Sequence, residues 1–411
     1  MGGSQPGGRA WHDEPQRPRE HGRTMTTTEI PLVRADEPAP AKSRHLRQID
    51  LYRVITFALV ILIHVVGSTT YQQDVVADAV QAPLHLTREA FFALTAFVLV
   101  FQYRDRPVPA GKFWRRRFPL VAVPYVVWTV IYWVYSMVAL NQPFGSMSGQ
   151  LRALGLDLVT GNAWYHLYFI LVTLQVYLLF PLLAKMFGLI RRRPWTVLAV
   201  SLAVQVAVTL FMSYPPGAVG YDVISHFFAT LLPYQFYTVL GMTAALHFER
   251  VHAWVRGHSR WVLLGMAAGL AIVEAGYFLS VHSGEWPEMA SDAFRPYLIP
   301  WCVAAIAGIY LAGARWADGK QRGGRFVSWA VDRSFAIFLC HPIAIAVLDP
   351  LAEFVGDRYG APWTTLAVYP ATILLTFAIA ELLRRLPWSK ALTGRVRAGA
   401  GAVTRPATAA A

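Results

Sequence analysis

Residues 50–66 read DLYRVITFALVILIHVV, an apolar stretch whose ionisable members are Asp50, Arg53 and His64. About 20 apolar residues are needed to cross a hydrocarbon core of about 30 Å. Runs of that kind occur ten times along the chain, at about 51–69, 84–103, 118–140, 164–189, 194–213, 223–247, 260–281, 294–315, 326–348 and 362–385. The sequence therefore predicts an all-α integral membrane protein with ten transmembrane helices.

The composition agrees with a chain that enters lipid repeatedly. Of the 411 residues, 55% are hydrophobic and 15% are charged, and the mean hydropathy is +0.39. Soluble domains carry about 25% charged residues, so a disordered chain, a coiled coil and most soluble enzymes are excluded. Cys302 and Cys340 each lie inside an apolar run, which gives neither a disulfide framework nor a zinc site. We expect no metal and no permanently bound cofactor.

The net charge of +13 comes from loops that flank the predicted helices. Lys and Arg gather before the first helix and after the second, fourth, sixth, eighth and tenth, whereas the alternate loops are poor in bases and 282–292 is acidic. Because cytoplasmic loops carry the excess of bases, both termini are predicted to be cytoplasmic. The bases serve the lipid bilayer surface, and nucleic acid is not expected as a partner.

Three segments follow from this pattern. Residues 1–44 are polar, lack the apolar region of a signal peptide and are predicted to be a disordered cytoplasmic tail, in which Met25 offers a second start. Residues 45–388 form the membrane domain. Residues 389–411 are predicted to be a disordered basic cytoplasmic tail, with no further domain after the tenth helix.

Ionisable residues inside a membrane span are costly and mark candidate sites. His64 follows Arg53 by 11 residues, which is about 16 Å and close to three helical turns, so the two share a helix face. A histidine titrating near neutrality beside a guanidinium suits general base catalysis. The alternative is a histidine that hydrogen-bonds a neighbouring helix.

Further candidates lie at the ends of other spans. Arg88 and Glu89 open the second span as an adjacent pair, which either binds substrate or pairs internally. Arg115, Arg116 and Arg117 open the third, where they either anchor the helix or clamp a phosphate. His166 and Tyr168 lie in an aromatic belt that could instead line an acceptor cleft. His341 lies about as deep in its span as His64 does, so the two could line one cavity. All of these residues lie within a predicted span or directly before one.

Several stretches resemble family-3 membrane acyltransferases, the group that includes bacterial O-acetyl- and O-succinyltransferases of surface polysaccharides, peptidoglycan and glycolipids. Asp50-x-x-Arg53 followed by His64 resembles the family's first helix. Further similarity, in the family's order, is carried by 91–97, 113–128, 164–181 (WYHLYFILVTLQVYLLFP) and 334–342 (SFAIFLCHP). The third of these is similar to the subgroup with the intercellular adhesin succinyltransferase and the enterobacterial-common-antigen acetyltransferase.

The resemblance implies a multi-pass enzyme of the bacterial cytoplasmic membrane. It would move an acyl group, acetyl first and succinyl second, from cytoplasmic acyl-CoA to a hydroxyl of a glycan or glycolipid. His64 matches the family's essential histidine, as general base or transient acyl carrier, with Arg53 and Asp50 beside it. Arg117 matches the first position of the family's R-x-x-R element, and Leu120 occupies the second, so Arg115 or Arg116 would substitute.

A second interpretation is a transporter or flippase for a polysaccharide or a lipid-linked sugar. Ten spans with buried His and Arg fit that class as well. The sequence shows no inverted repeat, and only the ninth span, which contains Pro342, looks interrupted, whereas transporters often pair their broken helices. Consumption of acyl-CoA would separate the two interpretations.

Overall fold

The computed structural model describes residues 45–71, 73–139, 145–217, 224 and 226–398 of the chain. Within these residues the regular secondary structure is helical throughout, without a β-strand. The all-α prediction is confirmed for this part of the chain. The tail predicted at 1–44 lies outside the described residues.

Nine helical stretches of the described residues are long and apolar enough to cross a membrane. They correspond to nine of the ten predicted spans. In chain order they are α1 (Arg47–Thr69), α2 (Val75–Leu84) with α3 (Leu86–Tyr103), α5 (Pro119–Ala139), α7 (Tyr168–Leu183) continuing through η1 (Ala184–Met186) into α8 (Phe187–Arg192), α9 (Pro194–Ser213), α13 (Ser259–His282), α15 (Leu298–Asp318), α16 (Gly324–Val347) and α18 (Ala361–Arg385).

The span predicted at 223–247 is corrected by the structure. Its described part holds a short 3-10 turn, η2 (Leu232–Tyr234), and then α11 (Gln235–Leu246), a helix of 12 residues. Pro233 lies in the turn and lacks the backbone N–H that a continuing helix would need. A helix of this length is too short to span a bilayer by itself, so among the described residues nine helices, not ten, are long and apolar enough to cross a membrane.

The short α11 instead packs against α3 in the interior. Val239, Met242 and Ala245 of α11 are buried, and a Cβ placed on Gly241 would overlap the carbonyl oxygen of Ala93. Glycine therefore permits the two backbones to approach closely, as small residues do at membrane helix contacts. The segment is apolar because it is buried in protein.

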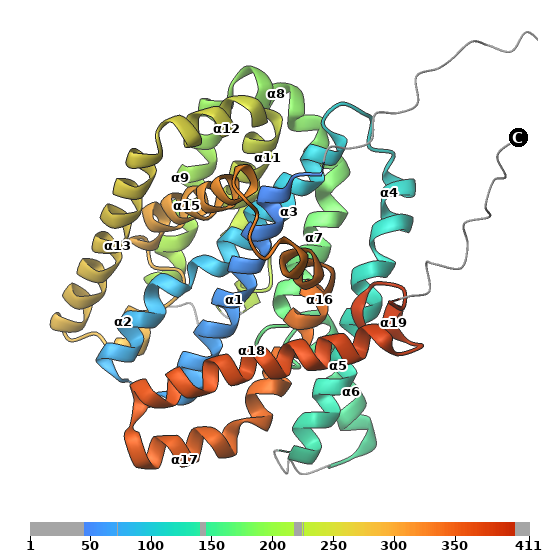
Figure 1. Ribbon diagram of the computed structural model, residues 1–411, viewed down its shortest axis with the longest axis vertical. Helices are drawn as coiled ribbons and strands as arrows, with labels where there is room; N and C mark the ends of the chain where they lie inside the picture. The colour runs from blue at the N-terminus through green and yellow to red at the C-terminus, as the bar shows by residue number, and fades with distance from the viewer. Residues whose placement is uncertain (1–44, 72, 140–144, 218–223, 225, 399–411) are drawn as a thin grey trace, which may run out of the picture. The chain divides into compact units, whose positions relative to one another are not determined.

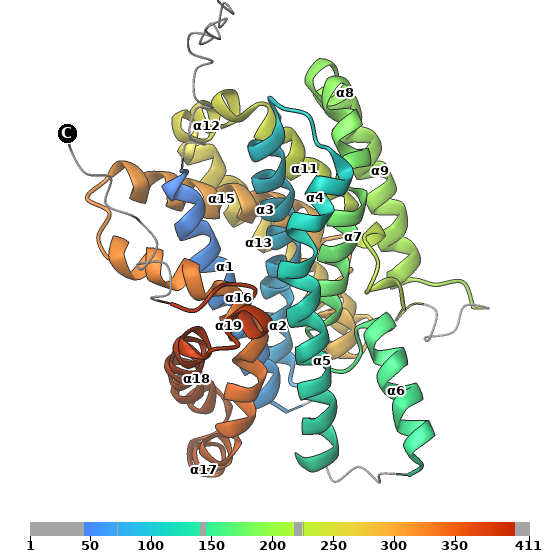
Figure 2. The same cartoon turned by 90° about the vertical axis from the view of Figure 1, so that its right-hand side faces the viewer.

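Short helices connect the spans, and one follows the last of them. They are α4 (Ala110–Arg117), α6 (Met147–Thr160), α12 (Phe248–Gly257), α14 (Pro287–Ala290), α17 (Asp349–Tyr359) and α19 (Ser389–Thr393). The basic α8 and α12 lie at one end of the helices, and α6 and α17 lie at the opposite end (Figures 1 and 2). The Arg-rich connections at α8 and α12 thus lie at the opposite end of the helices from the connection at α6, which has few basic residues. Which end faces the cytoplasm stays a prediction from charge.

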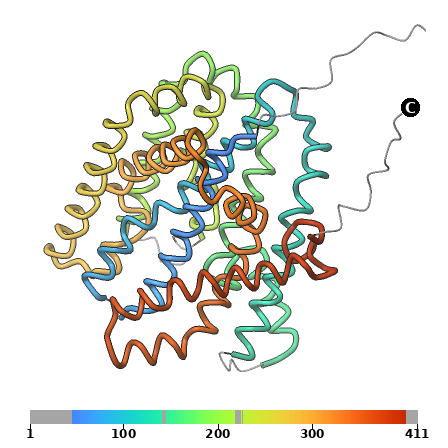
Figure 3. Tube along the Cα trace, viewed as in Figure 1, coloured from blue at the N-terminus to red at the C-terminus, as the bar shows by residue number. Residues whose placement is uncertain are grey.

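The first helix, α1, joins two parts of the hydrophobic core. It packs against α15, α16 and α18, and Figure 3 shows these segments around it although they are far apart in sequence. Ile49 and Tyr52 belong to a cluster with α3, α11 and α15, whereas Phe57, Ile61 and Val65 belong to another with α5, α16 and α18. The helix is therefore held on several sides, which fixes the direction of its polar side chains.

The C-terminal segment is held against α16 and α18. Nη1 of Arg384 donates to Oγ of Ser389 at 3.0 Å, and Nη2 of Arg384 donates to Oδ2 of Asp332 at 2.9 Å. Ser389 and Thr393 are buried. The sequence assigned 389–411 to a disordered tail; residues 389–398 are instead part of this packed segment, and 399–411 lie outside the described residues.

Candidate functional site

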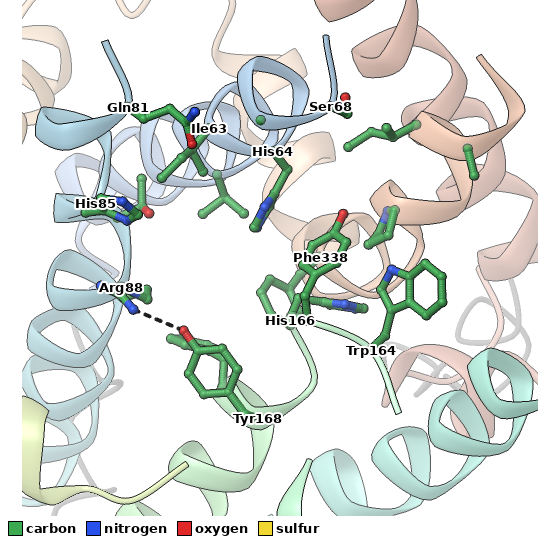
Figure 4. A pocket seen from close by; sticks show the side chains of 18 of the residues that line it. Ile63, His64, Ser68, Gln81, His85, Arg88, Trp164, His166, Tyr168 and Phe338 are labelled. Carbon is green, nitrogen blue, oxygen red and sulfur yellow. Dashed lines mark hydrogen bonds between the residues drawn. The ribbon is translucent and has the colours of Figure 1, made fainter. Parts of the chain in front are cut away.

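A cavity of about 570 Å³, here called the inner chamber, opens between α1, the junction of α2 and α3, the segment that leads into α7, and α16 (Figure 4). Its volume is within the range of small-molecule sites. The lining residues are Val60, Ile63, His64, Gly67, Ser68, Gln81, His85, Thr87, Arg88, Phe91, Tyr135, Trp164, Tyr165, His166, Tyr168, Phe169, Phe338, Pro342, Ile345, Ala346 and Asp349.

His64 projects from α1 into the inner chamber (Figure 4). Its neighbours Ile63 and Val65 are buried in the core and hold this turn of the helix in place. The centre of the His64 ring lies 4.6 Å from that of Tyr165 and 5.2 Å from that of His341, with the two imidazoles inclined by 27°. His64 and His341 therefore lie against each other, although His341 is not among the residues that line the inner chamber.

The ring of His341 is oriented by a feature of its own helix. Pro342 has no backbone N–H, so it cannot donate to the carbonyl oxygen of Phe338 one turn earlier. Nδ1 of His341 lies 2.7 Å from that oxygen. A carbonyl oxygen only accepts, so Nδ1 carries the hydrogen and donates it.

This hydrogen bond leaves Nε2 of His341 as the nitrogen with a free lone pair. His341 is fully buried, and its Nε2 has no hydrogen-bond partner among the described residues. The side chain thus presents an unpartnered acceptor nitrogen, in one tautomer, behind the ring of His64.

His166 adds a third imidazole from the segment that precedes α7. Its ring is perpendicular to that of His341 at 5.3 Å and contacts the rings of Tyr132 and Phe338 at 5.1 and 5.2 Å. Both ring nitrogens are buried without a hydrogen-bond partner among the described residues. Burial first, and then the neighbouring His341 and His64, lower the pKa of His166 well below its ordinary value of 6.5. His166 is therefore a neutral imidazole.

Arg88 enters the inner chamber from α3. Nη1 of Arg88 donates to the hydroxyl of Tyr168 at 3.4 Å, and its guanidinium lies 4.8 Å from the centre of the Phe294 ring. Nη2 of Arg88 lies 3.7 Å from Oε1 of the buried Glu89. Nε and Nη2 have no hydrogen-bond partner among the described residues. The guanidinium thus keeps buried donors that a bound oxygen atom could use.

A second cavity of about 750 Å³, here called the outer chamber, shares Gly67, Gln81, His85, Arg88, Trp164, Tyr165 and Tyr168 with the inner one. Most of its wall comes from the loop after α1, from α2, from the end of α6 and from the segment around α14. These segments belong to the loops that the charge pattern assigned to the non-cytoplasmic side. The remaining lining residues are Thr70, Tyr71, Gln73, Asp78, Gly161, Asn162, Phe228, Ala229, Glu288, Ser291, Asp292 and Ala293.

The other predicted site residues lie elsewhere. Asp50 is buried, and its Oδ2 lies 2.6 Å from Nε2 of His45. Arg53 is half-buried on α1 and is not among the residues that line the two chambers. Arg117 donates to Oε1 of Gln102, and Arg115 and Arg116 are exposed on α4. The roles assigned to these residues stay predictions, and Arg88 is the guanidinium that shares a chamber with His64.

The sequence singled out neither His85 nor Asp349 as a site residue. His85 lies three residues before Arg88, a spacing that puts both on one face of a helix, and this signal was present in the sequence. Asp349 begins α17 and closes the inner chamber on the side of α16. Burial first, and then the nearby Glu353, raise the pKa of the Asp349 carboxyl. Its place in the chamber depends on helix packing.

Comparison with known protein families gives a match. The model of a family described as an acyltransferase domain matches residues 46–381. The matched range contains α1 through most of α18 and every residue that lines the two chambers. The comparisons with curated proteins and with solved structures gave no match.

Proposed function

The chain belongs to acyltransferase family 3, and we propose that it is a membrane O-acyltransferase that moves an acyl group from cytoplasmic acyl-CoA to a hydroxyl of a cell-surface polysaccharide or glycolipid. Membership in an acyltransferase family disfavours the transporter interpretation. Acetyl-CoA is the first donor to test and succinyl-CoA the second.

The observation that carries the proposal is the position of His64 on the wall of a chamber that continues into a larger, polar one. As general base, His64 takes the proton of the acceptor hydroxyl while that oxygen attacks the thioester carbonyl carbon. The tetrahedral intermediate then expels CoA as its thiolate, and the imidazolium of His64 returns the proton to the sulfur. The products are an ester and free CoA.

A covalent route uses the same residue. A ring nitrogen of His64 attacks the thioester, CoA leaves, and the acceptor oxygen then attacks the acyl-imidazole. This route lets the acyl group reach the acceptor although donor and acceptor arrive from opposite faces of the membrane. In both routes Arg53, with Arg115, Arg116 and Arg117, would hold the phosphates of CoA towards the predicted cytoplasmic end. Asp50, beside Arg53, would orient that guanidinium.

The test uses purified full-length protein in lipid nanodiscs with acetyl-CoA and a glycan acceptor. We expect acceptor-dependent release of free CoA, measured with a thiol reagent, and an acylated product in the mass spectrum. His64→Ala should lower the rate at least 10²-fold, in the range of a general base. His258→Ala is the matched control, since His258 is exposed between α12 and α13 and hydrogen-bonds the carbonyl of Trp254.

The outcomes separate the alternatives. Undiminished CoA release by His64→Ala would refute the mechanism. An acyl adduct that accumulates on the wild-type chain without acceptor, and is removed by hydroxylamine, supports the covalent route. Arg53→Lys should raise the KM for acyl-CoA, because Lys lacks the planar fork that holds a phosphate by two hydrogen bonds.

A further inference from the structure

The outer chamber carries an excess of carboxylates. Asp78, Glu288 and Asp292 line it, and Arg88 is the one Lys or Arg among its lining residues. Arg88 has Glu89 beside it, with 3.7 Å between Nη2 and Oε1. The chamber therefore favours a cationic group over an anionic one.

Asp78 is the buried member of this set. Asp74 accepts hydrogen bonds from the backbone N–H groups of Val76 and Ala77 and so begins α2, which places Asp78 one turn further along. Asp78 is 6% exposed, and its Oδ1 accepts a weak hydrogen bond of 3.4 Å from Nε2 of Gln81. Its Oδ2 has no hydrogen-bond partner among the described residues. A buried carboxylate oxygen without a donor is costly, and a ligand with an N–H donor would offset that cost.

The rest of the wall suits a sugar ring. Tyr71, Trp164 and Tyr165 offer flat aromatic surfaces, against which the C–H faces of a pyranose pack, and Gln73 and Asn162 offer amides for its hydroxyls. The indole Nε1 of Trp164 is also buried without a partner among the described residues. Aromatic faces additionally attract cations.

We propose that the outer chamber is an amino-sugar subsite, in which a primary ammonium of the acceptor glycan donates to Oδ2 of Asp78 while the neighbouring sugar residue enters the inner chamber at His64. The proposal rests on the proposed function in taking the acceptor to be a glycan, and it names the class of that glycan. Arg88, at the junction of the chambers, donates its free N–H groups to an oxygen of the residue at His64.

The test measures binding, without acyl-CoA, to full-length protein in nanodiscs. The probes are a glucosamine oligosaccharide with free amines and its fully N-acetylated counterpart of equal length, at a pH where the amines are protonated. We expect the wild type to bind the amine form at least about tenfold more tightly. Asp78→Asn should remove that preference, because the neutral side chain no longer favours the ammonium over the acetamide. Asp357→Asn, on the exposed face of α17, is the matched control.

Three results would overturn the subsite. They are equal affinity of the wild type for both probes, an unchanged preference in Asp78→Asn, and displacement of the amine probe by phosphatidylethanolamine but not phosphatidylglycerol in the nanodisc. The last would assign the ammonium site to a lipid headgroup. If Asp78→Asn does not fold, the combined change Glu288→Gln and Asp292→Asn lowers the charge of the same wall and must reduce the preference.

Failure of this inference and failure of the proposed function look different. If His64-dependent CoA release is equally fast with the N-acetylated acceptor and with the amine acceptor, the proposed transferase function stands and the amino-sugar subsite is refuted. If the protein binds the amine probe selectively but releases no CoA, the amino-sugar subsite stands and the proposed transferase function is refuted.

Discussion

The Nδ1–H of His341 donates to the carbonyl oxygen of Phe338 at 2.7 Å, and that oxygen is the one that Pro342 leaves without a backbone donor. The proline therefore fixes the tautomer and direction of the histidine that precedes it. His341 in turn lies against His64, with 5.2 Å between ring centres. A local irregularity of α16 thus positions a side chain next to the proposed base.

Replacing Pro342 by Ala should lower the turnover rate without unfolding the protein. The new backbone N–H competes with Nδ1 of His341 for the Phe338 oxygen, so the ring loses its fixed orientation, and losses of about 10- to 100-fold are typical when a supporting hydrogen bond is removed. Pro370→Ala in α18, also a proline inside a helix, is the control. The idea fails if both variants release CoA at the wild-type rate or if both lose activity equally.

Arg88→Lys should raise the KM for the acceptor by about tenfold and leave the KM for acyl-CoA unchanged. Lysine keeps the positive charge but lacks the planar guanidinium of Arg88. That guanidinium donates to the hydroxyl of Tyr168 and has two further nitrogens, Nε and Nη2, that are free to donate to the acceptor. Initial-rate kinetics with each substrate varied in turn would measure the split. Arg358→Lys is a matched control, because Arg358 is exposed on α17 and also donates to a tyrosine hydroxyl, that of Tyr359 at 3.1 Å. A larger effect on the KM for acyl-CoA than on the KM for the acceptor would contradict a role of Arg88 in acceptor binding.

Gly241→Ala should destabilise the fold. Its methyl group would overlap the carbonyl oxygen of Ala93, so α11 and α3 must move apart, and overpacking of this kind costs about 1–3 kcal/mol. Gly265→Ala in α13 is the control, since the nearest atom to its added Cβ is 3.9 Å away, on Ala304. Thermal unfolding in detergent should show a lower midpoint for the first variant only. Equal midpoints would contradict the close packing of α11 on α3.

Acid should destabilise the protein through His166. The pKa of this histidine is lowered in the folded state, so the folded protein keeps it neutral while the unfolded chain takes up a proton as the pH falls through about 6.5. More protons bound in the unfolded state means that stability decreases below that pH and is flat above it. The melting midpoint, followed between about pH 5 and pH 7.5, should fall less in His166→Gln than in the wild type. An identical fall of the melting midpoint in both proteins would show that other groups cause the loss of stability in acid.

The sequence predicted much of the fold because hydropathy and helix length are local properties. Nine of the ten predicted spans match helices of the described residues. The exception, 223–247, is apolar because α11 is buried against α3, and hydropathy alone does not distinguish burial in protein from contact with lipid. Pro233 was the local sign that this run is not one long helix.

The candidate site was predicted only in part. His64, His166, Tyr168 and Arg88 were singled out from sequence and meet in the inner chamber, with His341 directly behind. Arg53 was expected to accompany His64 because both lie on one face of α1, but periodicity along one helix says nothing about which neighbouring helix supplies a charge. That charge comes from Arg88 of α3.

By itself the sequence determined that this chain is helical and apolar, and that it places a histidine deep within its first span, since each of these follows from residues close together in the chain. The tertiary structure decided which side chains share a space. Three imidazoles from α1, the segment before α7, and α16 come together, and Asp78 faces a chamber beside them, only because helices distant in sequence pack at fixed positions.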